Sequence, residues 1–134
     1  MDLELTRISS THHTLTYTRT DKTGETCKLE TKTFLIHDFI HFCLEREAKI
    51  SDGFFGLLSK GCTYAQLSGK LRIHTDLKIA LDVERIAGPF TGVVQGTVDV
   101  SEFISGIQNQ YDAYQEETPS WLTDRILSDM CAFW

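Results

Sequence analysis

The chain has 134 residues, of which 41% are hydrophobic and 24% are charged, and its formal net charge is −6 at pH 7. A chain of this length can bury enough apolar surface to fold without disulfides or a structural metal, so we expect one domain over residues 1–134. The acidic charge argues against a nucleic-acid partner, which would need a basic patch. No apolar run reaches the roughly 20 residues that span a bilayer, so we expect no membrane-spanning segment.

The four cysteines are widely spaced and form no C-x-x-C pair: Cys27, Cys43, Cys62 and Cys131. The N-terminal segment MDLELTR lacks the apolar core of a signal peptide. We therefore expect reduced thiols and a cytoplasmic protein.

The first thirty residues have the alternating pattern of antiparallel strands. In the segment HTLTYTRT, Leu15 and Tyr17 alternate with threonines, and in ETCKLET, Cys27 and Leu29 fall on one face. A turn over residues 21–24 joins these segments into a hairpin, in which we expect Gly24 to take a positive φ. An earlier strand over residues 3–8 should pair with the hairpin and give a sheet of about three strands.

The segment TFLIHDFIHFCLEREAK, residues 33–49, is expected to form the helix around which the rest of the chain is organised. At about 100° per residue, His37, Asp38, His41 and Glu45 fall within about a third of the circumference, and we call these four residues the polar stripe. Apolar side chains cover most of the remainder: Leu35, Ile36, Phe39, Ile40, Phe42, Cys43 and Leu44. Such a helix should be buried on nearly all sides and cover the sheet, with the polar stripe lining a cleft or the exposed edge of the core.

The pattern also predicts the start of the central helix and two more helical segments. The central helix should begin after Thr31 or Thr33, either of which can serve as N-cap. Residues 54–61, FFGLLSKG, indicate a short helical turn. Residues 76–87 are amphipathic with helical spacing, with Thr75 or Asp76 as the cap.

The C-terminal part is also expected to be helical. Residues 89–100 should continue the preceding helix after a kink, although their valines also favour a strand. Asp99 indicates an N-cap for the next helix, and Thr118 followed by Pro119 indicates the start of the last one. The whole pattern predicts an α+β fold: a small N-terminal antiparallel sheet, a central helix and several C-terminal helices.

The histidines of the polar stripe have the spacing of metal ligands. Residues four apart are neighbours on a helix, so His37 and His41 can each place one imidazole nitrogen on a common ion, and Glu45 can supply a carboxylate. This donor set suits a divalent transition metal: Zn, Fe, Mn or Ni. Asp38 and His74 are candidate supporting groups.

A compact site needs one more contribution. The three candidate ligands extend about 12 Å along the helix at 1.5 Å per residue, which is too far for all of them to meet one ion comfortably. A ligand should therefore come from another element, and the candidates are His12, His13, His74, Asp82 and Glu84.

Two other interpretations of the polar stripe stay open. The stripe can simply be solvated, with Glu45 pairing with His41 at the i, i+4 spacing. Alternatively it can have a metal-free acid–base or ligand-binding role, because histidine titrates near neutral pH.

The sequence supports two classes of function. The first is a small-molecule enzyme or binding protein whose pocket includes the polar stripe. The second is a non-catalytic protein-interaction or dimerisation module that uses the acidic, aromatic C-terminal helices; residues 99–134 carry seven acidic residues and one basic residue. The ending over residues 130–134 is too apolar to stay in water, so it should dock on the core or on a second copy, and we expect a homodimer.

The string HDFIH, which runs from His37 to His41, resembles two zinc motifs. It is similar to the His-Glu-x-x-His helix of zincin metalloproteases, with Asp38 at the position of their general base. It also resembles the His-Asp-x-x-His part of the zinc motif in the ubiquinone-biosynthesis scaffold family, whose glutamate would fall at Gly53. Both resemblances cover only this string, and neither assigns the chain to a family.

Overall fold

The computed structural model describes residues 1–68 and 78–133, so His74, Thr75, Asp76 and Trp134 lie outside the described residues. The strands β1 (Asp2–Arg7), β2 (His12–Thr18) and β3 (Gly24–Glu30) form one antiparallel sheet in the order β1-β2-β3. The helices are α1 (Thr31–Glu47), α2 (Phe54–Ser59), α3 (Tyr64–Leu67), α4 (Lys78–Val94), α5 (Val100–Ala113) and α6 (Asp124–Phe133). None of the described helices combines the length and the apolarity that crossing a bilayer requires. The α+β prediction is confirmed, and the single domain stays a prediction.

The inner face of the sheet is apolar because successive side chains of a strand point to opposite faces. Leu15 and Tyr17 of β2 are 2% and 1% exposed. Their register places them opposite Leu5 and Leu3 of β1. Aromatic side chains of α1, α2 and α3 complete this cluster, so these three helices cover the inner face.

The hairpin between β2 and β3 corrects one expectation. Lys22, with φ of 72°, takes the left-handed conformation of the turn, whereas Gly24 already belongs to β3. A Cβ atom on Gly24 would lie 1.9 Å from the carbonyl oxygen of Tyr17. The glycine is therefore required by the close approach of two strands and not by a positive φ.

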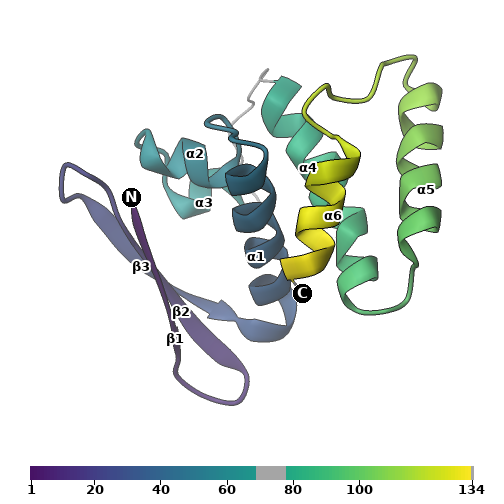
Figure 1. Ribbon diagram of the computed structural model, residues 1–134. Coiled ribbons are helices and arrows are strands. Elements are labelled where there is room, and N and C mark those ends of the chain that lie inside the picture. The colour runs from purple at the N-terminus through teal and green to yellow at the C-terminus, as the bar shows by residue number, and fades with distance from the viewer. Residues whose placement is uncertain (69–77, 134) are drawn as a thin grey trace.

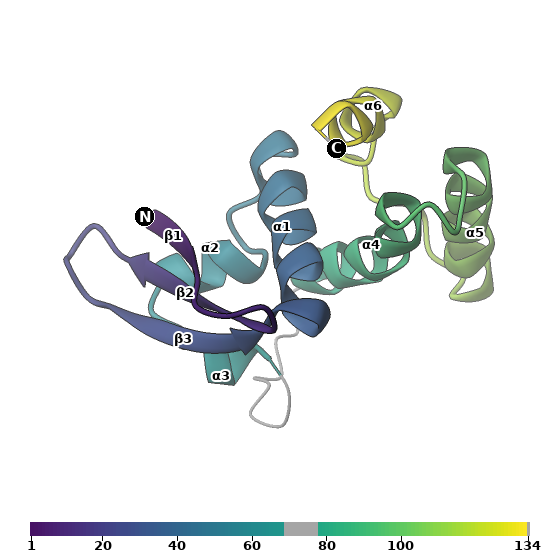
Figure 2. The same ribbon diagram turned by 90° about the horizontal axis from the view of Figure 1, so that it is seen from below.

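Helix α1 is the central element, as predicted (Figure 1). It lies between the sheet on one side and α4 and α6 on the other, while α5 packs on α4 further out (Figure 2). The sheet and the C-terminal helices thus bury different faces of one helix.

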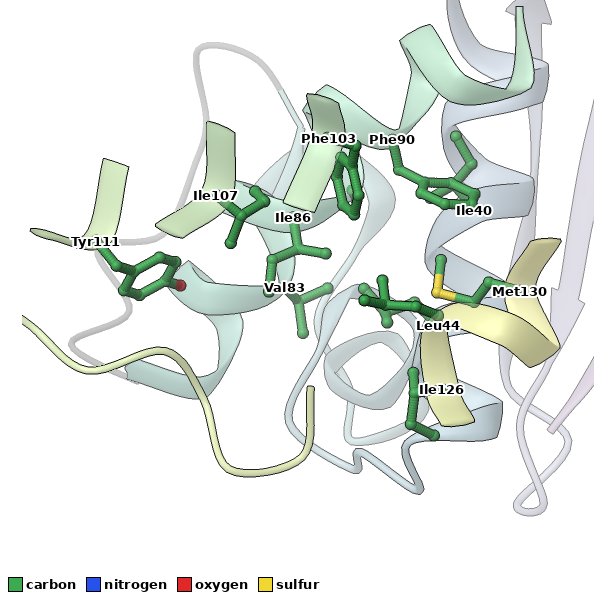
Figure 3. Close-up of a cluster of buried hydrophobic side chains, with 12 residues drawn as sticks. Ile40, Leu44, Val83, Ile86, Phe90, Phe103, Ile107, Tyr111, Ile126 and Met130 are labelled. Atoms are coloured by element: carbon green, nitrogen blue, oxygen red, sulfur yellow. The ribbon is translucent and has the colours of Figure 1, made fainter. Parts of the chain in front are cut away.

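The larger apolar cluster joins α1 to the C-terminal helices (Figure 3). From α1, Ile40 and Leu44 are both 0% exposed. The other buried members come from α4, α5 and α6: Val83, Ile86, Ala87, Phe90, Phe103, Ile107, Tyr111, Ile126, Leu127 and Met130. Phe39, which faces away from this cluster in the helical periodicity, is only half-buried.

Two predicted helix starts are wrong. Helix α1 has Glu30 as its N-cap residue, and Thr33 donates its hydroxyl to the Glu30 carboxylate instead of capping the backbone. The last helix begins at Asp124, where Thr123 Oγ1 accepts the backbone N–H of Ile126 at 3.2 Å. A proline is tolerated at the first position of a helix but does not require one to start, and the apolar residues that follow Pro119 pack on the core before the helix begins.

The expected helical continuation after residue 88 is confirmed as far as Val94. Pro89 lies inside α4 on its exposed side. The chain then turns through Gly96, whose φ is 75°. Asp99 caps α5 as predicted by accepting the backbone N–H of Glu102 at 2.8 Å.

The C-terminal helix docks on the chain's own core. Met130 is 0% exposed within the cluster that includes α1, and Trp121 packs against the same cluster. Tyr111 is 1% exposed, so part of the aromatic surface proposed for an interaction module faces inward.

The homodimer stays a prediction, which sedimentation of the full chain over a wide concentration range can test. We expect a dimer whose fraction rises with concentration, because any apolar surface left by the C-terminal helices would be covered in it. A monomer at every concentration would contradict the dimer and leave the docking of α6 unaffected.

Candidate metal centre

The polar stripe is far more buried than a solvated stripe would be. Asp38, His41 and Glu45 are 4%, 1% and 5% exposed, and the side chain of His37 is 36% exposed. Placing ionisable groups in the interior is costly unless each finds a partner. The interpretation of a simply solvated stripe is therefore wrong for three of its four residues, and their partners define the site.

A carboxylate from α4 completes a compact group with the two histidines. Single ligand atoms of His37, His41 and Glu84 all lie within 4.8 Å of one another. Glu84 Oε1 lies 3.3 Å from His41 Nε2, and Glu84 Oε2 lies 3.8 Å from His37 Nε2. Two imidazoles and a carboxylate from two packed helices thus meet at one point, a geometry that could hold a metal ion.

The packing of α4 on α1 explains the position of Glu84. On α4, Glu84 lies four residues after Ala80 and three before Ala87, so all three share one side of the helix. The small side chain of Ala87 is 0% exposed and lets the two helices approach closely. The sequence alone does not show which side of α4 packs on α1, so no local signal singled out Glu84 among the five candidates.

The other nitrogen of each histidine faces a different carboxylate. His41 Nδ1 lies 3.3 Å from Glu45 Oε2 within hydrogen-bond geometry, and His37 Nδ1 lies 3.7 Å from Asp38 Oδ1. A histidine that binds metal through one nitrogen commonly donates the N–H of the other to a carboxylate, which fixes the ring and raises its basicity. Both histidines have such a carboxylate on their Nδ1 side and Glu84 on their Nε2 side.

Glu45 also holds the start of α2. Its Oε1 accepts the backbone N–H groups of Phe55 at 3.0 Å and Gly56 at 3.2 Å. A Cβ atom on Gly53 would lie 2.3 Å from Glu45 Cδ, so a glycine is needed for this approach. The structure therefore places Glu45 behind His41 and outside the compact group that contains Glu84.

The other candidates among the described residues do not join this group. Asp82 accepts hydrogen bonds from Tyr111 and Lys78 on another side of α4. His12 and His13 contact the hydroxyls of Thr11 and Thr31 on the sheet side of the molecule. His74 lies outside the described residues.

The cluster favours a positive charge at His41. Burial lowers the pKa of His41, but the hydrogen bond to Glu45 and the negative charges of Glu45 and Glu84 outweigh it and raise the pKa to about 9. Although His41 Nε2 lies close to Glu84, the contact is not aligned as a hydrogen bond, and this buried nitrogen has no other hydrogen-bond partner among the described residues. The position between Nε2 and Glu84 is thus suited to a cation.

The site opens on a pocket of about 300 Å³. Its lining combines groups of the site with aromatic and apolar side chains: Phe34, His37, Asp38, Phe54, Tyr64, Leu67, Ser68 and Glu84. Pockets that bind drug-sized molecules begin at about this size. His37 and Glu84 are both partly exposed here, so an ion held by them would be accessible from the pocket.

Comparison with known protein families, with curated proteins and with solved structures finds no match to this chain. Neither of the zinc-motif resemblances therefore gains support from a wider similarity. The class that fold and site define is an α+β protein with a candidate two-histidine, one-carboxylate cluster beside a small pocket.

Proposed function

We propose that this protein binds one divalent transition-metal ion through His37, His41 and Glu84 and presents it to a small molecule in the adjoining pocket. The observation that carries the proposal is the convergence of the three ligand atoms within 4.8 Å, with a buried imidazole nitrogen that lacks an aligned partner. Zn, Fe, Mn and Ni all accept this donor set.

The spacing of the donors supports a metal better than it supports hydrogen bonds. Two ligands that each lie ~2.1 Å from a tetrahedral ion are ~3.4 Å apart. The contacts of 3.3 and 3.8 Å to Glu84 are close to this spacing, and neither is aligned as a hydrogen bond. A small adjustment of side chains would bring all three donors to an ion.

The surrounding acids have supporting roles in this proposal. Glu45 holds His41 through Nδ1 and orients this imidazole without binding the ion itself, whereas Asp38 lies 3.7 Å from His37 Nδ1, too far for a hydrogen bond. Three protein ligands would leave coordination positions for a substrate or a water molecule. When bound, the ion would supply Lewis acidity to a group in the pocket.

Elemental analysis of protein purified without a His tag tests the proposal, together with calorimetric titration of chelator-treated protein with Zn²⁺, Fe²⁺, Mn²⁺ and Ni²⁺. We expect one equivalent of metal per chain. If no metal co-purifies and none of these ions binds, the cluster is a metal-free acid–base or ligand site, which its raised His41 pKa would also suit.

From the pKa of His41 we predict how pH changes the stability of the fold and its affinity for metal. Its pKa of about 9 lies above the ordinary value of 6.5, so protonation stabilises the metal-free fold fully below pH 6.5, and this contribution is lost as pH rises through 9. A metal on Nε2 must displace that proton, so metal affinity should rise about tenfold per pH unit up to about pH 9.

Melting temperatures measured with metal and with chelator between about pH 6 and pH 9 check this result. The difference between the two temperatures should widen as pH rises. A difference that stays constant would show that His41 does not exchange a proton for the metal.

A further inference from the structure

A second pocket, of about 160 Å³, lies between the edge strand β1 and helix α1. Six of its lining residues are apolar and one is charged: Leu3, Leu5, Leu15, Phe39, Phe42, Phe55 and Asp38. Leu5 is 39% exposed at the rim, so the pocket is accessible from solvent. It combines an apolar wall with a single carboxylate.

Among the described residues, none offers that carboxylate a cationic partner at hydrogen-bond distance. Asp38 is 4% exposed, and its Oδ2 accepts the hydroxyl of Tyr64 at 2.9 Å. The ion pair that the described residues offer it is His37 Nδ1 at 3.7 Å from Oδ1, beyond hydrogen-bond distance. A buried carboxylate with one neutral donor is poorly compensated, so a positively charged donor beside Oδ1 would be strongly favoured.

We propose that this second pocket binds a small hydrophobic amine, with the ammonium group at Asp38 and the apolar body against Leu5, Phe39 and Phe42. The size of the pocket determines the apolar part of the ligand, because cavities of about 150 Å³ lined by leucine, isoleucine and phenylalanine hold one benzene ring. The charge of the pocket determines the head group of the ligand, because Asp38 is the sole charged residue among the described residues that line the pocket. The proposal does not rest on the metal site.

The charge requirement separates this pocket from an ordinary apolar hole. An apolar cavity without a charged group would accept any ring of the right size. A buried carboxylate instead forms stronger hydrogen bonds with charged donors than with neutral donors. It also repels anions of the same shape. Ligands that share one ring and differ only in the charge of the head group therefore provide the sharpest comparison.

The experiment titrates the chelator-treated full chain with benzylamine, benzyl alcohol and benzoate at pH 7, followed by heteronuclear NMR. We expect benzylamine to bind at least tenfold more tightly than benzyl alcohol, with shifts at Leu5, Phe39 and Phe42, and benzoate not to bind. Asp38→Asn keeps an acceptor for Tyr64 and should remove the preference for the amine.

A second variant covers the case in which Asp38→Asn fails to fold. Leu5→Trp fills the rim of the pocket and should weaken benzylamine binding at least tenfold, whereas Leu81→Trp, at a leucine of similar exposure on α4, should leave it unchanged. Equal binding of benzylamine and benzyl alcohol, or full binding by Leu5→Trp, would overturn the proposal. Metal titration is a separate measurement, so the two proposals fail independently.

Discussion

Glu84→Gln should lower the affinity of the protein for the proposed metal ion more than about 100-fold. Residues that only orient a metal ligand typically account for 10–100-fold, and Glu84 is proposed as a ligand itself. The amide keeps the shape of the side chain but removes the negative charge that faces both imidazoles. Calorimetric titration with Zn²⁺ at fixed pH measures the effect.

Above about pH 9, where His41 is neutral, stability should change little in the same variant, because the Glu84 side chain is 31% exposed. The matched control is Glu117→Gln, which changes the net charge equally at an exposed site and should bind metal like the wild type. Metal binding that survives Glu84→Gln, at full stoichiometry and affinity, would remove Glu84 from the site. A metal held only by α1 residues would then be the remaining explanation.

Glu45→Ala should lower the free energy of unfolding by about 3–5 kcal/mol, the range for breaking a buried charged pair. The substitution leaves the backbone N–H groups of Phe55 and Gly56 without their acceptor and His41 Nδ1 without its partner. Glu45 therefore holds the start of α2 to α1 in addition to the apolar packing between these helices. Urea denaturation of the chelator-treated protein measures the loss.

Glu47→Ala is the control for this effect, since Glu47 lies on the same helix and pairs at the surface with Arg46. Surface substitutions of this kind change stability by less than about 0.5 kcal/mol. The pair of variants also separates the roles of the two glutamates. If Glu45→Ala abolished metal binding without destabilising the fold, Glu45 would be a ligand, as the sequence pattern first indicated.

The site was only partly predictable. Helical spacing alone brings His37 and His41 together, because residues four apart share one face whatever the tertiary fold. The three candidate ligands of α1 extend about 12 Å along the helix. The sequence therefore also indicated that a further ligand had to come from another element. Five candidates remained, and choosing Glu84 required knowledge of which side of α4 packs on α1.

The burial of the polar stripe could not be predicted from the sequence either. Hydrophobicity suggested that the polar side of α1 faces a cleft, yet Asp38, His41 and Glu45 are more buried than the apolar Phe39. The buried carboxylates of the stripe contact groups distant in sequence, such as the hydroxyl of Tyr64 or the backbone of α2. Partners of this kind are formed only by the tertiary fold.

What the sequence by itself determined is local and periodic. Alternation identified the three strands, helical spacing identified α1, α4 and α5, and Asp99 was recognised as a cap because it bonds to a backbone group only three residues away. The tertiary structure decided what depends on contacts between distant segments: the anchoring role of Glu45 and the approach of Glu84 to His37 and His41. Those features are settled by packing energies that sum over many distant residues, and no local pattern in the chain encodes them.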